Sequence, residues 1–232
     1  MIVAPFRTAA DGIARETALL QAGQPALLLW QAEETALVMP HALARRDDMQ
    51  IPLRSATAEG CRIAFRGSGG GIVPQGSATL NLAMVLPCRA DFTMEDGYRM
   101  ICGTVAEALT RFEVTTHTGS CPGAFCDGAW NVLAEGRKLA GTAQRWRATP
   151  EGRVALLHAA ILLHMPDPAT WVEMGLLHRA AFPAEPPLRP DAHITLDRLM
   201  PATMSHTRFP GALIRAAEDR LSASTRREER AA

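Results

Sequence analysis

The chain has 232 residues, 47% of them hydrophobic and 21% charged, and its 24 basic side chains balance 24 acidic ones. A chain of this length can bury a large hydrophobic core within one domain. Because the charges cancel, no net field attracts nucleic acid or an anionic membrane, and we expect neither as a partner.

The cysteines argue against a disulfide framework. There are five, an odd number, and Cys121 and Cys126 have no second Cys or His pair at the spacing of a zinc site. The N-terminal residues lack the basic start and apolar run of a signal peptide, and the longest apolar run, residues 154–163, is too short to span a bilayer. We therefore expect a soluble cytoplasmic protein with reduced thiols and no metal site.

The first part of the chain predicts a helix followed by strands. Apolar residues recur at helical spacing over residues 11–21, with Asp11 as a candidate cap. Short apolar runs at 26–30 and 35–39 predict two adjacent strands. The prolines and charges of residues 40–60 indicate a surface loop, with room for a short helix.

A glycine-rich loop follows a predicted strand at residues 61–65. It reads Arg66-Gly67-Ser68-Gly69-Gly70-Gly71, with four glycines in five positions. Glycines let backbone N–H groups approach a bound group closely, so the loop could receive a carboxylate, a phosphate or a carbonyl oxygen. It lacks the Gly-Lys-Ser/Thr ending of a P-loop and the spacing of a dinucleotide fingerprint, and a flexible turn between strands is the simpler interpretation.

The middle of the chain predicts a strand at residues 78–86 and a helix at 94–112. Thr93 is a candidate helix cap with Asp96 three positions later, as in a capping box. The Met and Leu stripe of this helix is expected to be core.

Residues 120–147 are where we expect the chemistry. Gly, Pro and Cys fill the first positions, strands are predicted at 130–134 and 137–146, and Glu135-Gly136 is predicted to be the tight turn between them. Such a hairpin would bring Cys126 close to Lys138. A nearby ammonium favours a thiolate, and a thiolate can accept an acyl group and pass it on. An inert loop cysteine and a solvated lysine are the simpler interpretation of this pair.

The C-terminal part predicts a strand at residues 154–163, in which His158 is more simply a core histidine than a functional one. A proline-rich connection at 183–190 leads to an amphipathic helix at 208–221 and a charged, frayed tail from Ser224. Strands grouped around one long helix, without regular βαβ alternation, indicate an α+β fold with a mixed to antiparallel sheet and flanking helices. We expect a catalytic domain at 1–182 and, packed on it, the connection and final helix at 183–232.

Three segments together resemble the biotin/lipoate protein ligase superfamily, most closely its lipoate branch. They read RGSGGGIVPQGSATLNLAMVLP, CDGAWNVLAEGRKLAGTAQR and VALLHAAILL, in that order. The Cys-x-Gly-x-aromatic-Asn pattern, with a lysine twelve positions after the cysteine, resembles octanoyltransferases that use a cysteine thioester, including those that take octanoyl from the glycine cleavage H protein. The resemblance implies a single catalytic domain of the biotin/lipoate ligase fold.

Carried over position by position, the resemblance implies that Cys126 accepts the acyl group and that Lys138 contacts the acyl carbonyl. Cys121 is the fallback nucleophile. The expected wall of the acyl pocket is formed by Arg66, Ser68, Gly69, Gly70, Gly71, Asn81, Gly141, Thr142, Ala143, Gln144 and His158. This chain departs from the pattern at Pro74-Gln75 and at Ala159-Ala160, where related enzymes carry other residues.

Three hypotheses follow. The leading one is an acyltransferase, needing no cofactor, that passes an octanoyl or lipoyl group through Cys126 to the lysine of a lipoyl-carrier domain, of the 2-oxoacid dehydrogenase E2 or glycine cleavage H protein type. The second is a lipoate ligase that uses ATP and Mg, in which Lys138 binds an acyl-adenylate and Cys126 is incidental. The third is a non-catalytic relative that binds lipoyl domains or acyl chains.

Overall fold

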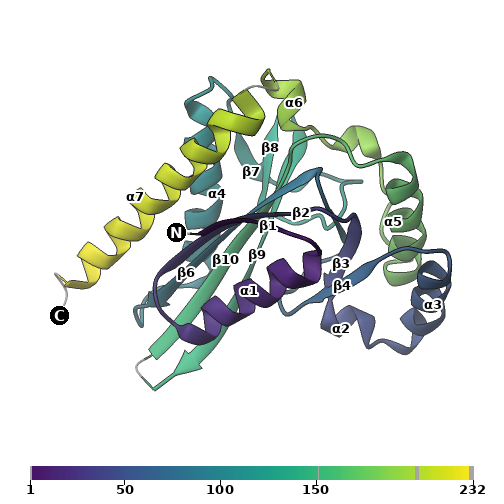
Figure 1. Ribbon diagram of the computed structural model, residues 1–232, viewed down its shortest axis with the longest axis horizontal. Helices are drawn as coiled ribbons and strands as arrows, with labels where there is room; N and C mark the ends of the chain where they lie inside the picture. The colour runs from purple at the N-terminus through teal and green to yellow at the C-terminus, as the bar shows by residue number, and fades with distance from the viewer. Residues whose placement is uncertain (1, 151, 202–203, 230–232) are drawn as a thin grey trace.

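A seven-stranded sheet forms the centre of the protein in the computed structural model, which describes residues 2–150, 152–201 and 204–229. Within these residues the strand order is β1-β2-β6-β10-β9-β8-β7 (Figure 1). Among the described strands of this sheet only β1 and β2 pair in parallel, and the other neighbours are antiparallel, which confirms the predicted mixed sheet. The strands are β1 (Ile2–Phe6), β2 (Ala26–Ala32), β6 (Thr79–Cys88), β7 (His117–Gly119), β8 (Asn131–Ala134), β9 (Arg137–Thr149) and β10 (Gly152–Leu162).

A second, three-stranded sheet has the order β4-β3-β5 among the described residues. It consists of β3 (Ala36–Pro40), β4 (Ile63–Arg66) and β5 (Val73–Gln75). The runs at 26–30 and 35–39 were expected to be adjacent strands, but they lie in different sheets. The reason is that β6 pairs with β2, whereas β4 and β5 flank β3 on both sides.

Residues 40–60 are mostly helical, which corrects the predicted loop. They form α2 (His41–Ala44), the 3-10 turn η1 (Asp47–Met49) and α3 (Gln50–Ala58). Pro52 lies in the first turn of α3, where its missing N–H costs no intrahelical hydrogen bond. The segment also buries Met49 and Ala56, so it is a packed element rather than a surface connection.

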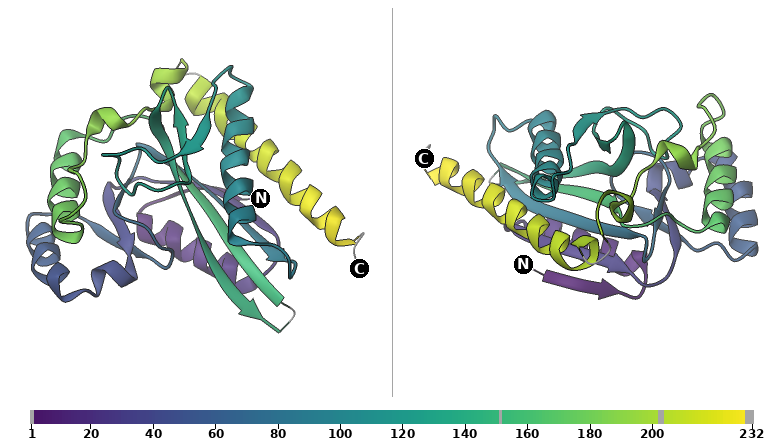
Figure 2. Two further views of the ribbon diagram at one scale, coloured as in Figure 1. Left: turned by 180° about the vertical axis from the view of Figure 1, so that it is seen from behind. Right: turned by 90° about the horizontal axis from the view of Figure 1, so that it is seen from above.

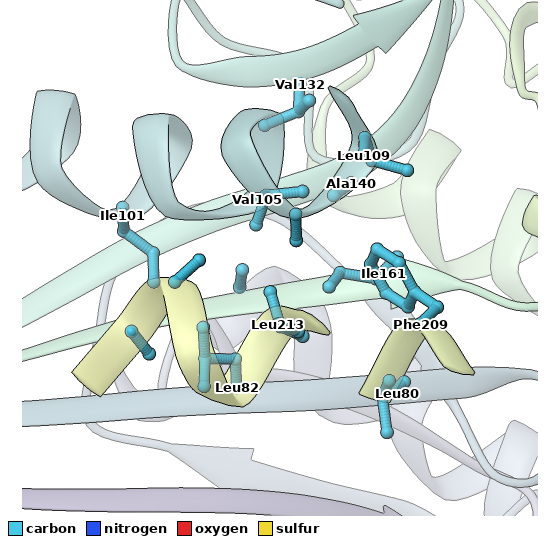
Figure 3. Packing of buried hydrophobic residues seen from close by; sticks show 14 of the residues in the cluster. Leu80, Leu82, Ile101, Val105, Leu109, Val132, Ala140, Ile161, Phe209 and Leu213 are labelled. Carbon is cyan, nitrogen blue, oxygen red and sulfur yellow. The ribbon is translucent and has the colours of Figure 1, made fainter. Parts of the chain in front are cut away.

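Helices cover both faces of the large sheet. On one face α4 (Met94–Thr110) and α7 (Phe209–Glu229) pack side by side, and α1 (Ala9–Ala22) lies on the other (Figure 2). Alternate residues of β2 show this division, because Leu27 and Leu29 join the core under α4 and α7, whereas Leu28 and Trp30 pack beneath α1. Figure 3 shows α4 and α7 residues meeting Leu80 and Leu82 of β6.

The remaining elements follow β10 in the chain. They are α5 (Pro168–Ala181), η2 (Pro190–Ala192), α6 (Leu196–Leu199) and the short π-helix η3 (Met204–Arg208). Neither α5 nor β1 was expected from the sequence. The helix predicted at 208–221 runs on to Glu229, so the predicted frayed tail is helical that far, and its last three residues lie outside the described ones. Within the described residues, no helix combines the length and apolar character needed to cross a bilayer.

Two of the helix starts have capping boxes. Thr93 and Asp96 form the predicted box at α4. At α1 the N-cap is Thr8, whereas Asp11 had been expected to be the cap. Asp11 is instead the acid at the third helical position, and its carboxylate accepts a hydrogen bond from the Thr8 N–H.

Candidate active site

Cys126 lies in the loop between β7 and β8, and Asp127 holds that loop in shape. One oxygen of Asp127, Oδ1, accepts hydrogen bonds from the backbone N–H groups of Cys121 and Gly128 and from the side-chain amide of Asn131, each at 2.7 Å. Asn131 also donates to the carbonyl of Gly128 at 2.8 Å. The loop therefore has a fixed course on both sides of Cys126.

The thiol of Cys126 meets the glycine-rich loop. The Gly71 N–H donates to Cys126 Sγ at 2.9 Å. A Cβ atom at Gly70 would lie 2.7 Å from the same sulfur, so a side chain at that position would collide with the thiol. Cys126 itself has φ +46°, a left-handed conformation that L residues adopt at a cost.

Arg66 ties the glycine loop together. Its buried guanidinium donates to the carbonyls of Val38 at 3.0 Å, Gly69 at 2.9 Å and Gly71 at 2.7 Å. Burial lowers the pKa of Arg66, and negative charge on the nearby Cys126 sulfur opposes that shift. The residue thus brings positive charge to the thiol and fixes the loop that donates to it.

Lys138 is fully buried at the start of β9, with 0% of its surface exposed. The predicted turn exists, with Glu135 at φ +50° and Gly136 at φ +71°, and it returns the chain so that Lys138 lies beside the thiol loop. Lys138 Nζ donates to the carbonyls of Phe125 at 2.6 Å and Cys126 at 2.8 Å. Burial lowers the pKa of this ammonium, and negative charge on Cys126 opposes the effect.

A cavity opens beside the thiol, between the two sheets and α1. Cys126, Phe125 and Arg66 contribute one part of its wall. The other lining residues are Ile13, Glu16, Trp30, Val38, Val73, Gln75, Asn81, Gly141, Thr142, Ala143, His158, Ala159 and Ala160.

Polar groups in this wall bind one another. Glu16 accepts a hydrogen bond from Trp30 Nε1 at 2.9 Å and lies 3.2 Å from His158 Nδ1. Gln75 and Asn81 exchange two amide hydrogen bonds of 2.8 Å. These polar side chains are therefore paired within the wall, except that the buried Nε2 of His158 has no hydrogen-bond partner among the described residues.

Most of the predicted site residues converge on this cavity. Arg66, Asn81, Gly141, Thr142, Ala143 and His158 line it, and Gly70 and Gly71 press against Cys126. Lys138 lies behind the thiol loop, and a Cβ at the lining residue Gly141 would be 3.2 Å from its Nζ.

Four further predicted residues do not line the cavity. Gln144 lies on the other face of the sheet, where it donates to the carbonyl of Met94 at 2.8 Å. The side-chain oxygen of Ser68 is buried without a hydrogen-bond partner among the described residues, and a Cβ at Gly69 would meet open space. Cys121 is buried with its thiol 3.2 Å from the carbonyl of Ala192.

His193 is a site residue that the sequence analysis missed. It is 1% exposed, and its Nε2 accepts a hydrogen bond from the Phe125 N–H at 3.2 Å. Burial and the neighbouring Lys138 lower the pKa of His193 to about 4. Its surrounding sequence, DAHIT, matches no catalytic pattern, and only the fold brings it next to the thiol loop.

The fold is that of lipoate protein ligase catalytic domains. Lipoate-protein ligase A bound with ATP aligns with a TM-score of 0.69 and 18% identity, over 96% of this chain and 84% of that one. A bi-partite lipoate protein ligase with its E2 lipoyl domain, from Thermoplasma acidophilum, aligns with a TM-score of 0.60 and 17% identity, over 95% and 82%.

Sequence comparison identifies the family of the chain. Residues 8–215 match the Lipoyl protein ligase A/B catalytic domain family, and the chain belongs to that family. An octanoyl-[GcvH]:protein N-octanoyltransferase of Kyrpidia tusciae is 34% identical over 148 residues, 60% of this chain. An uncharacterised protein of Cupriavidus necator is 33% identical over 174 residues, 66% of this chain and 67% of its own length. The matched region spans 50% of the Kyrpidia enzyme.

Proposed function

We propose that this protein is an acyltransferase that moves an octanoyl or lipoyl group to the lysine of a lipoyl-carrier domain through a thioester at Cys126. The observation that carries the proposal is the position of the Cys126 sulfur, at the wall of a cavity and 2.9 Å from the Gly71 N–H. The Kyrpidia tusciae relative, which is named an octanoyl-[GcvH]:protein N-octanoyltransferase, supports the same chemistry.

In the first step the Cys126 sulfur, as the thiolate, attacks the acyl carbonyl of the donor. A sulfur–carbon bond forms, the bond from the carbonyl to the donor's lysine nitrogen breaks, and the departing amine takes up a proton. The Gly71 N–H and the buried charge of Arg66 stabilise negative charge on the sulfur before the attack.

Lys138 acts on the oxygen that becomes negative during both steps. An ammonium has three N–H donors, and the carbonyls of Phe125 and Cys126 accept two of them. Nζ lies next to the cavity-lining Gly141, and we propose that its third N–H donates to the acyl oxygen, where a donor held in advance stabilises the developing charge.

In the second step the neutral lysine amine of an acceptor domain attacks the thioester. A carbon–nitrogen bond forms, the carbon–sulfur bond breaks, and the sulfur leaves as the thiolate while the amine loses its extra proton. The acceptor's amide replaces the donor's, so no external energy source is consumed.

Transfer between carrier domains tests the proposal. An octanoylated glycine cleavage H protein is the donor, an unmodified E2 lipoyl domain is the acceptor, and the product is followed by intact mass with and without ATP. We expect transfer without ATP, its loss in Cys126→Ala and its retention in Cys121→Ala.

Other outcomes favour the alternatives. Modification only when ATP and free octanoate or lipoate are supplied, with full activity in Cys126→Ala, would show a ligase in which the cysteine has no covalent role. Binding of the carrier domain without transfer from any donor would show a non-catalytic protein.

A further inference from the structure

A short segment that contains η2 and precedes α6 is hydrogen-bonded to the thiol loop. We call residues 189–194 the strap. The Arg189 N–H donates to the carbonyl of Gly123 at 2.8 Å, and the Ile194 N–H donates to the carbonyl of Lys138 at 3.0 Å. The strap therefore bridges the loop that carries the thiol and the strand that carries the lysine.

His193 is the strap residue that reaches the peptide next to the nucleophile. The carbonyl of Arg189 lies 3.0 Å from His193 Nδ1, so it accepts the proton carried there. This leaves a lone pair on Nε2, which faces the Phe125 N–H. If Nε2 were protonated, its N–H and the Phe125 N–H would face each other as two donors with no acceptor between them. The nearby Lys138 ammonium also disfavours a charged ring.

The Phe125 peptide is held at both of its polar groups. His193 accepts from its N–H, and Lys138 Nζ donates to its carbonyl. The Phe125 ring stacks on the His193 ring with 4.4 Å between centroids, and Trp171 lies 5.0 Å from His193 on centroid distance. These contacts fix the residue directly before Cys126.

The next residue needs such support. Cys126 has φ +46°, and a conformation of this kind persists only where the surroundings impose it. If the Phe125 N–H loses its acceptor, the peptide can rotate and Cys126 can relax to a negative φ. The sulfur would then leave the Gly71 N–H.

We propose that His193 is a positioning residue that holds the Cys126 thiol against the Gly71 N–H by accepting the Phe125 N–H. The inference rests on the proposed function, in that the thiol so positioned is the acyl carrier. The proposal predicts that the position of the thiol depends on the acceptor atom at the Nε2 position, and not on the bulk or charge of the side chain.

Two substitutions separate these contributions. His193→Gln places an amide oxygen near the Nε2 position, whereas His193→Leu has similar bulk and no acceptor. His178→Leu is the matched control, because His178 is also buried and bonded through Nε2, here to the Pro186 carbonyl in the region of α5. Folding of each variant is checked by thermal unfolding.

The first readout needs no acyl donor. Alkylation of Cys126 by iodoacetamide is quantified from fragment ions that separate it from Cys121, which lies on the same tryptic peptide. The rate should fall on the order of tenfold in His193→Leu, the equivalent of losing one hydrogen bond to a charged group. We expect His193→Gln to restore most of the rate and His178→Leu to match the unmodified protein.

The second readout is transfer itself. In His193→Leu we expect kcat to fall in proportion to the alkylation rate, with an unchanged KM for the acceptor domain. Equal alkylation rates in the unmodified protein and a folded His193→Leu, or a folded His193→Gln that is as slow as His193→Leu, would overturn the inference. If His193→Leu does not fold, His193→Asn replaces it, because the shorter amide does not reach the Nε2 position.

Failure of the proposed function gives a different result. In that case the unmodified protein forms no acyl adduct, while the alkylation rates still report whether His193 positions the thiol.

Discussion

Two glycines have similar positive φ angles and different surroundings. Gly70 has φ +99° and Gly60 has φ +91°, both unfavourable for an L side chain. A Cβ at Gly70 would lie 2.7 Å from the Cys126 sulfur, whereas one at Gly60 meets nothing within 4 Å. The pair therefore separates backbone strain from obstruction of the thiol.

We predict that Gly60→Ala lowers the free energy of unfolding by about 1 kcal/mol and leaves transfer unchanged. Gly70→Ala should lower the free energy of unfolding by at least roughly 1 kcal/mol more than Gly60→Ala does, because the added methyl group overpacks the site. It should also reduce the rate of transfer at least about 100-fold, the usual effect of misplacing a reacting atom by about 1 Å. Urea unfolding and the carrier-domain assay measure the two effects. Equal activity in the two variants would show that the thiol does not need its contact with the glycine loop.

Lys138→Met removes the ammonium and keeps most of the side-chain length. We expect kcat to fall about 100- to 1,000-fold, the usual loss when one preorganised donor to a developing oxyanion is removed. Arg137→Met is the control, because Arg137 is the preceding residue and its ion pair with Glu135 is solvent-exposed. A Lys138→Met protein that transfers as fast as Arg137→Met would contradict the role of the ammonium.

The helix α1 depends on a close approach to the sheet. A Cβ at Gly12 would overlap the ring of Trp30, which lines the cavity together with Ile13 and Glu16 of the same helix. The glycine at this position therefore sets how near α1 lies to the sheet and, with it, the width of the cavity.

We predict that Gly12→Ala destabilises the protein by about 1–3 kcal/mol through overpacking, and that it alters the preference among acyl chains of different length. Gly175→Ala in α5 is the comparison, since nothing lies within 4 Å of a Cβ there and alanine favours a helix by about 1 kcal/mol. Thermal unfolding should move in opposite directions for the two variants. A Gly12→Ala protein as stable as the unmodified one would show that α1 can shift freely.

Elements whose signals are local could be predicted from the sequence. The Thr93-Asp96 box and the Glu135-Gly136 turn each depend on neighbouring residues, and both exist in the structure. The division of the runs at 26–30 and 35–39 between two sheets could not be predicted, because the first run pairs with residues 51 to 59 positions away and the second with residues 26 positions away. At 40–60 only a short helix was allowed for, and the helical content was underestimated because prolines near a helix start resemble those of a loop.

The candidate site could also be predicted only in part from the sequence. The glycine loop, the cysteine and the lysine were named from their motifs, and the fold brings them together. The sequence did not show that Lys138 lies behind the thiol loop or that Gln144 lies on the opposite face of the sheet. His193 comes from a segment 55 positions after Lys138 in the chain, so only three-dimensional contacts reveal it.

The buried His193 also makes the stability of the whole protein depend on pH. Its pKa falls from 6.5 to about 4 on folding, so between these pH values the unfolded chain binds a proton that the native protein does not. The contribution to stability is therefore intact above pH 6.5 and declines as the pH falls toward 4, by about 3 kcal/mol in all.

Urea unfolding between pH 7.5 and pH 4 checks this, with His193→Gln as the reference that lacks the titrating group. We expect the stability of the unmodified protein, relative to the variant, to fall by roughly 3 kcal/mol over that range. A constant difference between the two proteins would mean that His193 binds its proton equally in the folded and unfolded states.

The most direct measurement is to identify the atom that carries the acyl group. The protein is mixed with an octanoylated carrier domain, the reaction is stopped in acid within one turnover, and the peptides are mapped by mass spectrometry. The account predicts one octanoyl group on Cys126, located by fragmentation because Cys121 lies on the same tryptic peptide, released by hydroxylamine as a thioester and absent in Cys126→Ser. Transfer that proceeds at full rate in Cys126→Ser, or an adduct on Cys121 alone, would contradict it.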